Sequence, residues 1–96
     1  MLFVAIGWDA ADSKEKRPRV RPDHLAHWKE MDEAGRVVIA GPMTDFAGSL
    51  FIVEAESQQA IEAHMARDPY LLQGVFQRVE VHPFKGVLPS RTYGAA

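Results

Sequence analysis

The chain has 96 residues, of which 47% are hydrophobic and 25% charged, and its formal net charge is −2. This length fits a single domain with one core, and the slight negative charge disfavours a nucleic-acid surface, which normally carries a clear basic excess. The absence of cysteine excludes disulfides and thiolate chemistry. No apolar run approaches the length of a membrane span and no leader-like segment follows Met1, so we expect a cytoplasmic protein without a membrane partner.

The first third of the chain predicts a strand, a polar loop and a helix. Residues 2–8 (LFVAIGW) form a short apolar run that is typical of a buried strand. Residues 9–22 are polar and contain two prolines, which predicts a loop. A helix over residues 23–34 follows, with Asp23 as its N-cap and Gly35 in the left-handed position after its last turn.

The remainder predicts two strands joined by a turn, a second helix that begins after Ser57, a last strand and an irregular tail. These elements span residues 36–41, 49–55, 58–67, 75–82 and 83–96. The order β-α-β-β-α-β predicts an α+β fold of the ferredoxin-like type, a single domain over residues 1–96 in which two helices cover one face of an antiparallel sheet.

The strands predict a partner for the other face of that sheet. In residues 2–8, and again in the two central strands, both sets of alternating side chains are apolar. A sheet with one face in water should alternate apolar and polar residues. Because two helices cover only one face, we expect a homodimer in which a second copy covers the other.

Each predicted helix directs one ionisable residue toward the core. On the first, Trp28 lies about 40° from His24 around the helix axis, which places His24 within the apolar stripe. On the second, Asp68 lies about 20° from Ile61 if the helical turn continues that far. A buried histidine or carboxylate needs a partner, so the pattern predicts that His24 and Asp68 contact each other or share a polar pocket.

Each of these residues also has a purely structural interpretation. Asp68 precedes Pro69 and can act as the N-cap of a short turn over residues 69–72, with proline in its favoured first position. His24 can be a core residue whose hydrogen bonds are satisfied. The functional alternative is that the carboxylate fixes the tautomer of the imidazole and raises its basicity, as in a general base.

The ordered set of short motifs resembles the YCII (YciI-like) family, which belongs to the dimeric α/β-barrel superfamily. The matching motifs are His24-Leu25, Gly35, Gly41-Pro42, Asp68-Pro69-Tyr70 and a closing Val-x-Pro-Phe, within residues 1–85. The resemblance implies a ferredoxin-like fold that pairs as a dimeric α/β barrel. It also implies that His24 and Asp68 act as a catalytic pair, in a family whose relatives include enzymes acting on small aromatic or lactone compounds.

Further residues are candidates for binding a small-molecule ligand. Gly41 and Pro42 leave the end of a strand, where they either form a structural turn or let backbone amides approach a ligand. Three large apolar side chains either line a pocket or belong to the core: Trp28, Met43 and Tyr70. Arg21 belongs to a basic segment, residues 14–21, which is either a solvated loop or a source of contacts to an anionic substrate.

These residues favour an enzyme that uses a His-Asp pair for proton transfer, of the isomerase, lyase or hydrolase type, on a small anionic or aromatic compound. The alternative is a non-catalytic ligand-binding or accessory dimer. We expect no cofactor and no metal site, since His24 and His27 are accompanied by no further ligand motif.

Overall fold

The computed structural model describes residues 1–94, which form four strands and four helices. The strands are β1 (Leu2–Asp9), β2 (Val37–Pro42), β3 (Gly48–Glu54) and β4 (Phe76–Phe84). The helices are α1 (Ser13–Glu33), α2 (Gln58–Ala66), α3 (Pro69–Leu72) and α4 (Ser90–Tyr93). No helix of these residues is long and apolar enough to cross a membrane.

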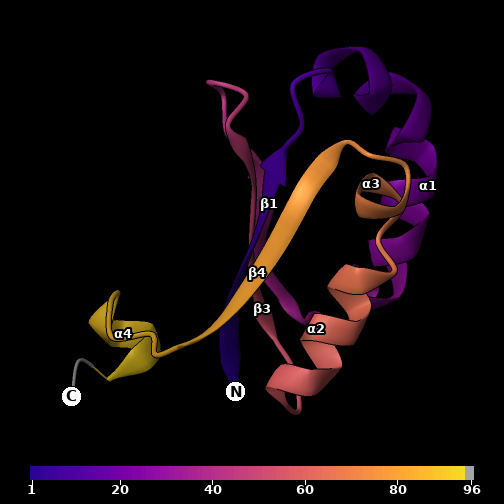
Figure 1. Ribbon diagram of the computed structural model, residues 1–96. Coiled ribbons are helices and arrows are strands. Elements are labelled where there is room, and N and C mark those ends of the chain that lie inside the picture. Colours follow the sequence, from indigo (N-terminus) through magenta and orange to yellow (C-terminus); the bar gives the residue numbers. More distant parts are fainter. Residues whose placement is uncertain (95–96) are drawn as a thin grey trace.

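The four strands form one antiparallel sheet in the order β2-β3-β1-β4, and α1, α2 and α3 lie on one of its faces (Figure 1). Phe3 pairs with Val53 on one side of β1 and with Pro83 on the other. Pro83 is tolerated because β4 is an edge strand, where a missing N–H interrupts no second ladder. The predicted ferredoxin-like α+β fold is confirmed.

The core lies between the sheet and these helices. Along β1, Phe3 and Ala5 are fully buried, whereas Val4 and Ile6 on the opposite face are half-buried. Gly7 continues the buried set, and a Cβ at this position would overlap the ring of Phe76. The other buried core side chains are Val20, Trp28, Phe51, Val53, Ala55, Ile61, Met65, Tyr70, Val75 and Phe76.

The predicted loop over residues 9–22 is wrong, because α1 begins at Ser13 and contains Pro18 and Pro22. Asp23 is consequently an interior residue of the helix and not its N-cap. Each proline removes a helical N–H and disfavours the helix by about 3 kcal/mol in isolation. Side-chain contacts offset this cost, since Val20 is buried in the core and Asp9 accepts a hydrogen bond of 2.8 Å from Ser13 Oγ. The first turns of α1 lie at an angle to the rest of the helix (Figure 1).

The end of the chain also differs from the expectation of an irregular tail over residues 83–96. β4 continues to Phe84, and α4 forms a short helix that stands away from the body of the domain (Figure 1). Residues 95–96 lie outside the described part of the chain. The remaining boundaries agree with the predictions to within two residues, including Gly35, which has φ of 72° after the end of α1.

Candidate active site

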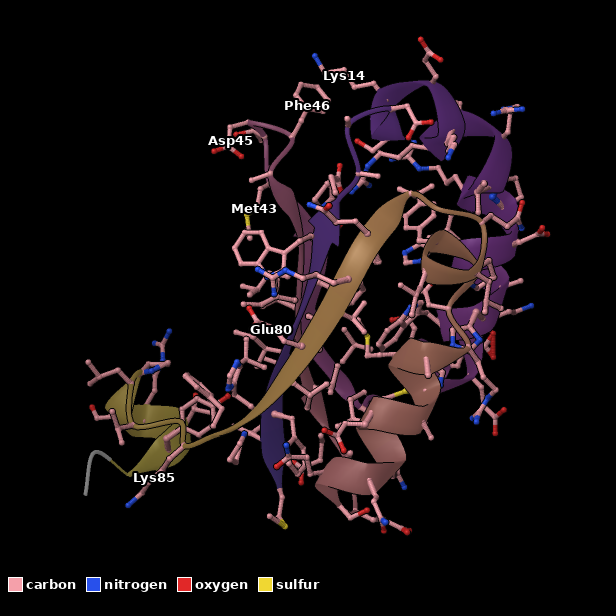
Figure 2. The ribbon with its side chains drawn as sticks, viewed as in Figure 1. Lys14, Met43, Asp45, Phe46, Glu80 and Lys85 are labelled. Atoms are coloured by element: carbon pink, nitrogen blue, oxygen red, sulfur yellow. The ribbon has the colours of Figure 1, made fainter. Side chains whose placement is uncertain are left out.

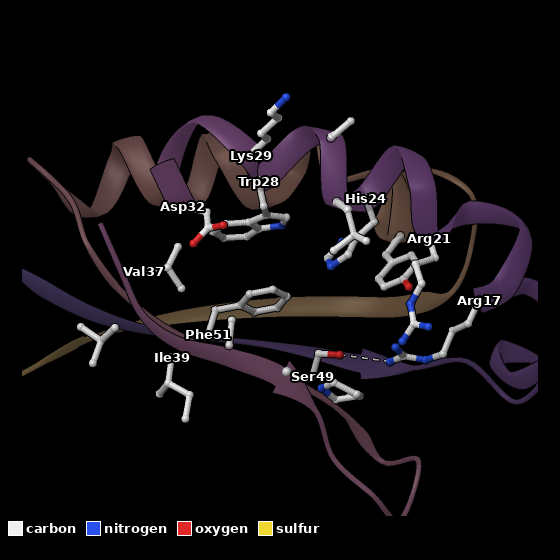
Figure 3. Close-up of a pocket in the computed structure, with 17 residues that line it drawn as sticks. Arg17, Arg21, His24, Trp28, Lys29, Asp32, Val37, Ile39, Ser49 and Phe51 are labelled. Atoms are coloured by element: carbon white, nitrogen blue, oxygen red, sulfur yellow. Dashed lines mark hydrogen bonds between the residues drawn. The ribbon is translucent and has the colours of Figure 1, made fainter. Parts of the chain in front are cut away.

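Four side chains of α1 form a stripe that faces the sheet. Arg17, Arg21, His24 and Trp28 are separated by four, three and four residues, so they project from one side of the helix. Figure 3 shows His24 and Trp28 reaching from α1 toward Phe51 on β3. The side chain of His24 is 12% exposed, in agreement with the predicted inward orientation.

Asp68 is the fully buried centre of the hydrogen-bond network at this site. Its Oδ1 lies 2.8 Å from His24 Nδ1, and its Oδ2 accepts a 2.8 Å bond from Trp28 Nε1. Oδ1 also accepts a 2.9 Å bond from the Tyr70 amide, which caps α3. The predicted contact with His24 and the predicted N-cap role are therefore both present, and one carboxylate performs both.

The charge of Asp68 is stabilised despite its burial. Burial alone would raise the pKa of this carboxyl, but hydrogen bonds from His24 and Trp28, the charge of His24 and the amide of Tyr70 outweigh it and lower the pKa. A carboxylate can only accept, so Nδ1 of His24 carries the proton that faces it. In the neutral ring, Nε2 is then left with a free lone pair.

Aromatic rings fix the plane of the imidazole. Tyr70 stacks on His24 with 3.8 Å between ring centroids and an interplanar angle of 9°. Trp28 stacks on Phe51 at 4.7 Å and 8°, next to the imidazole. Because the ring of His24 is stacked on one side and hydrogen-bonded at Nδ1, its orientation is set before any ligand binds.

The site opens into a cleft of about 720 Å³ between α1 and the β2–β3 side of the sheet. Of the residues predicted to contact a ligand, five line this cleft: Arg21, Trp28, Gly41, Pro42 and Tyr70. Met43 does not line it. The Met43 amide closes the β2–β3 turn through a 2.7 Å bond to the Gly48 carbonyl, and the side chain lies away from the helices (Figure 2).

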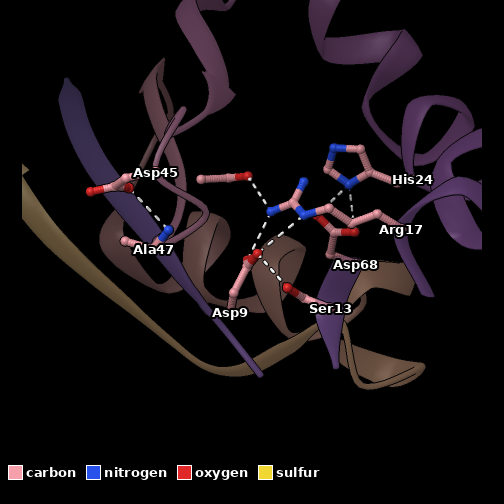
Figure 4. Close-up of polar contacts among 8 residues, drawn as sticks. Asp9, Ser13, Arg17, His24, Asp45, Ala47 and Asp68 are labelled. Atoms are coloured by element: carbon pink, nitrogen blue, oxygen red, sulfur yellow. Dashed lines mark hydrogen bonds and ion pairs between the residues drawn. The ribbon is translucent and has the colours of Figure 1, made fainter. Parts of the chain in front are cut away.

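Arg17 also lines the cleft, although its place in the basic segment of residues 14–21 does not by itself predict this position. Its Nη2 and Nε donate to Asp9 at 2.8 and 3.2 Å, and Nη2 also donates to Ser49 Oγ at 3.1 Å (Figure 4). The guanidinium lies 5.1 Å from the centroid of the Tyr70 ring. The seven-residue spacing between Arg17 and His24 could have indicated that they share a helix face. That inference requires the helix to begin before Pro18, which the sequence did not predict.

The other histidines lie outside this arrangement. His27 donates from Nε2 to the carbonyl of His64 at 2.8 Å, and the two imidazoles stack at 4.0 Å. Among residues 1–94, His64 Nε2 is buried without a hydrogen-bond partner, and burial together with the charge of His27 lowers the pKa of His64 to about 4. Among residues 1–94, no three potential ligand side chains gather closely enough to hold a metal ion.

Comparison with known proteins places this chain in a family. The YCII-related domain model matches residues 1–85. The chain belongs to the YCII family. It is 43% identical to Protein YciI of Escherichia coli O6:H1 over 97 residues, covering 91% of this chain and 99% of that protein. An uncharacterised Haemophilus influenzae protein is 36% identical with the same coverage.

Two solved structures show how the YCII chain compares in three dimensions. One is 5-chloro-2-hydroxyhydroquinone dehydrochlorinase of Burkholderia phenoliruptrix AC1100, in complex with 2,5-dihydroxybenzoquinone. It is 26% identical, with a TM-score of 0.78, over 88% of this chain and 94% of that chain. The other, an antibiotic biosynthesis monooxygenase, is 16% identical with a TM-score of 0.57, over 91% of this chain and 99% of that one, and shows the shared fold alone.

Proposed function

We propose that this YCII protein is a small-molecule enzyme in which His24 transfers a proton and Asp68 orients and stabilises the imidazole. One observation carries the proposal: His24 Nδ1 lies 2.8 Å from a fully buried carboxylate, while the same residue lines a cleft of about 720 Å³. A histidine that served only to fill the core would not need to line a cleft of this size.

The contacts of His24 support a general-base role. With Nδ1–H held by Asp68, Nε2 is the atom that can accept a proton, and the imidazolium that forms is stabilised by the adjacent negative charge. Trp28 and the Tyr70 amide keep Asp68 ionised, so the carboxylate does not take the proton itself. The electrons of the broken C–H or O–H bond move into the substrate, which then expels a leaving group or regains the proton at another atom.

The walls of the cleft and the solved relative support a small anionic or aromatic substrate. Trp28, Phe51 and Tyr70 present aromatic surfaces, and Arg17 and Arg21 present cations. The dehydrochlorinase with the similar structure acts on a chlorinated hydroxyhydroquinone, and such a reaction removes a proton and a chloride from one molecule. The same proton-removing step, with or without a leaving group, is what His24 can perform here.

The proposal is tested by proton exchange. A panel of small hydroxyaromatic and carboxylic acids, with chlorinated hydroxyhydroquinones among them, is incubated with the protein in D₂O and followed by NMR and chloride release. We expect wild type to exchange or eliminate with at least one compound, and His24→Gln to be slower by about 10²–10⁴-fold. Glu62→Gln, which changes an exposed residue of α2 outside the cleft lining, serves as the control. Equal rates for wild type and His24→Gln would overturn the proposal, and binding without turnover would leave a ligand-binding role.

We also propose that the protein forms a homodimer through the sheet face opposite the helices. Among the described residues no element packs over that face, where Val4 pairs with Ile52 and Ile6 pairs with Leu50. Burying this apolar surface against a second copy removes it from water. Light scattering at micromolar concentration should give twice the 10.7 kDa mass of one chain. A monomer under these conditions would refute the dimer.

A further inference from the structure

We infer that one end of the cleft, formed by Arg17, Arg21 and Ser49 and here called the anion clamp, binds a singly charged oxyanion of the substrate. This inference rests on the proposed function for the identity of the bound molecule as a substrate. The bound substrate would be a small planar monoanion such as a carboxylate or phenolate, with its charge at this end of the cleft.

Arg17 supplies donors that are already fixed in place. Its guanidinium has five N–H groups, and the bonds to Asp9 and Ser49 use those of Nε and Nη2. The N–H groups of Nη1 have no partner among residues 1–94. The side chain is only 15% exposed and that of Asp9 3%, so Nη1 is held rigidly and a ligand need not order it.

Ser49 completes this wall from the sheet. It is 3% exposed, and its hydroxyl oxygen accepts the bond from Arg17 Nη2, which leaves its own O–H free to donate. Both Ser49 and Arg17 line the cleft. A buried hydroxyl and a half-buried guanidinium that both retain donors toward one cavity suit an acceptor with two or more lone pairs.

The charges at this end favour one negative charge on the ligand. Asp9 neutralises Arg17 through their ion pair, whereas Arg21 forms no ion pair among the described residues. The far end contains both Lys29 and Asp32, which carry opposite charges. The anion clamp therefore has an excess of one positive charge, so a monoanion is the complementary ligand.

The spacing along α1 relates the charge to the reacting atom. Arg21 precedes His24 by three residues, or about 4.5 Å along the helix axis, and Trp28 follows His24 by about 6 Å. A ring bound against Trp28 and Phe51 would therefore extend past His24 toward the anion clamp. The atom that exchanges a proton then lies between the apolar end and the charged end of the ligand.

Binding of benzoate and of its neutral counterpart benzamide, measured by NMR titration, tests the clamp without requiring turnover. We expect wild type to prefer benzoate, and Arg21→Gln or Ser49→Ala to weaken benzoate binding by about tenfold while benzamide binding is unchanged. Arg19→Gln is the matched control, because Arg19 lies on the same helix and outside the cleft lining. Arg17 is retained in these variants, since its loss would leave Asp9 buried and unpaired.

The outcomes separate this inference from the proposed function. The absence of a preference for benzoate in wild type, or an equal loss in Arg19→Gln and Arg21→Gln, would overturn the anion clamp. Proton exchange that depends on His24 without a charge preference would leave the proposed function intact and refute the clamp. A benzoate preference that persists in His24→Gln, with no exchange by wild type, would support the clamp and refute the catalytic role.

Discussion

Replacing Asp68 by alanine and by asparagine should separate its structural role from its chemical role. Alanine leaves three buried donors without their acceptor: His24 Nδ1, Trp28 Nε1 and the Tyr70 amide. Each unpaired buried donor costs about 1–3 kcal/mol. The three share one carboxylate and are not additive, so we expect Asp68→Ala to lower the free energy of unfolding by about 3–5 kcal/mol.

Asparagine keeps one acceptor oxygen and replaces the other by an amide. The oxygen can still accept from Tyr70 and cap α3, so the loss of unfolding free energy should be about 1–2 kcal/mol. That oxygen, in the place of Oδ1, also still accepts from His24 Nδ1. The amide nitrogen takes the place of Oδ2, where it meets the Trp28 Nε1–H donor and cannot accept from it. The variant lacks the negative charge that stabilises the imidazolium formed during proton transfer, so activity should fall by about 10²–10⁴-fold even though the fold is kept.

Urea unfolding at pH 7 and the D₂O exchange assay measure the two effects on the same variants. Asp45→Ala provides the matched control, because Asp45 also accepts from a backbone amide, that of Ala47 at 3.1 Å, but does so at an exposed turn (Figure 4). Loss of this hydrogen bond in Asp45→Ala should lower the free energy of unfolding by about 1 kcal/mol or less and leave proton exchange unchanged. An Asp68→Asn variant as unstable as Asp68→Ala, or one with full activity, would contradict this assignment of roles.

Substitutions at four further positions test the packing of the domain. His64 resists protonation until about pH 4 in the folded protein but titrates near 6.5 when unfolded, so the unfolded chain binds more protons between these values and stability falls as the pH is lowered. Urea unfolding at pH 7 and at pH 4.5 measures this loss of unfolding free energy. After allowance for partial solvent access, His64→Leu should reduce the loss by on the order of 1–2 kcal/mol. A loss as large as that of wild type would refute this effect. Tyr70→Phe should keep the stacked ring and stay within about 0.5 kcal/mol of wild type, whereas Tyr70→Leu should slow exchange through a less ordered imidazole. Gly7→Ala should cost about 1–3 kcal/mol of unfolding free energy through overlap with the Phe76 ring, while Gly41→Ala, with open space around its Cβ, should be near neutral.

Much of the fold could be predicted because its signals are local and agree with one another. The short apolar run of residues 2–8 predicted β1, Ser57 marked the start of α2, and Gly35 marked the end of α1. The contact between His24 and Asp68 followed from the inward position of His24 on its helix and from the cost of burying either group alone. The helical turn does not continue to Asp68, because α2 ends at Ala66 and Asp68 is extended. Each of these inferences uses a short stretch of chain and one strong physical preference.

The N-terminal half of α1 could not be predicted because its signals come from outside the segment. Local rules count Pro18 and Pro22 against a helix, whereas the contacts that hold this helix come from Asp9 on β1 and from the burial of Val20 in the core. Those partners are visible only after the sheet has formed. Arg17 was missed for the same reason, since its helical spacing from His24 has no meaning in a loop.

The missed helix and the candidate site have a common physical origin. A helix that packs on a core repeats apolar residues on one face, and that repeat is what reveals a helix in a sequence. Over residues 17–24 the inward face of α1 borders a cleft and presents Arg17, Arg21 and His24, so the apolar repeat is absent there. The polar groups that would bind and react with a ligand thus also interrupt the apolar pattern from which the helix could be predicted. Such departures from local rules are expected at functional sites.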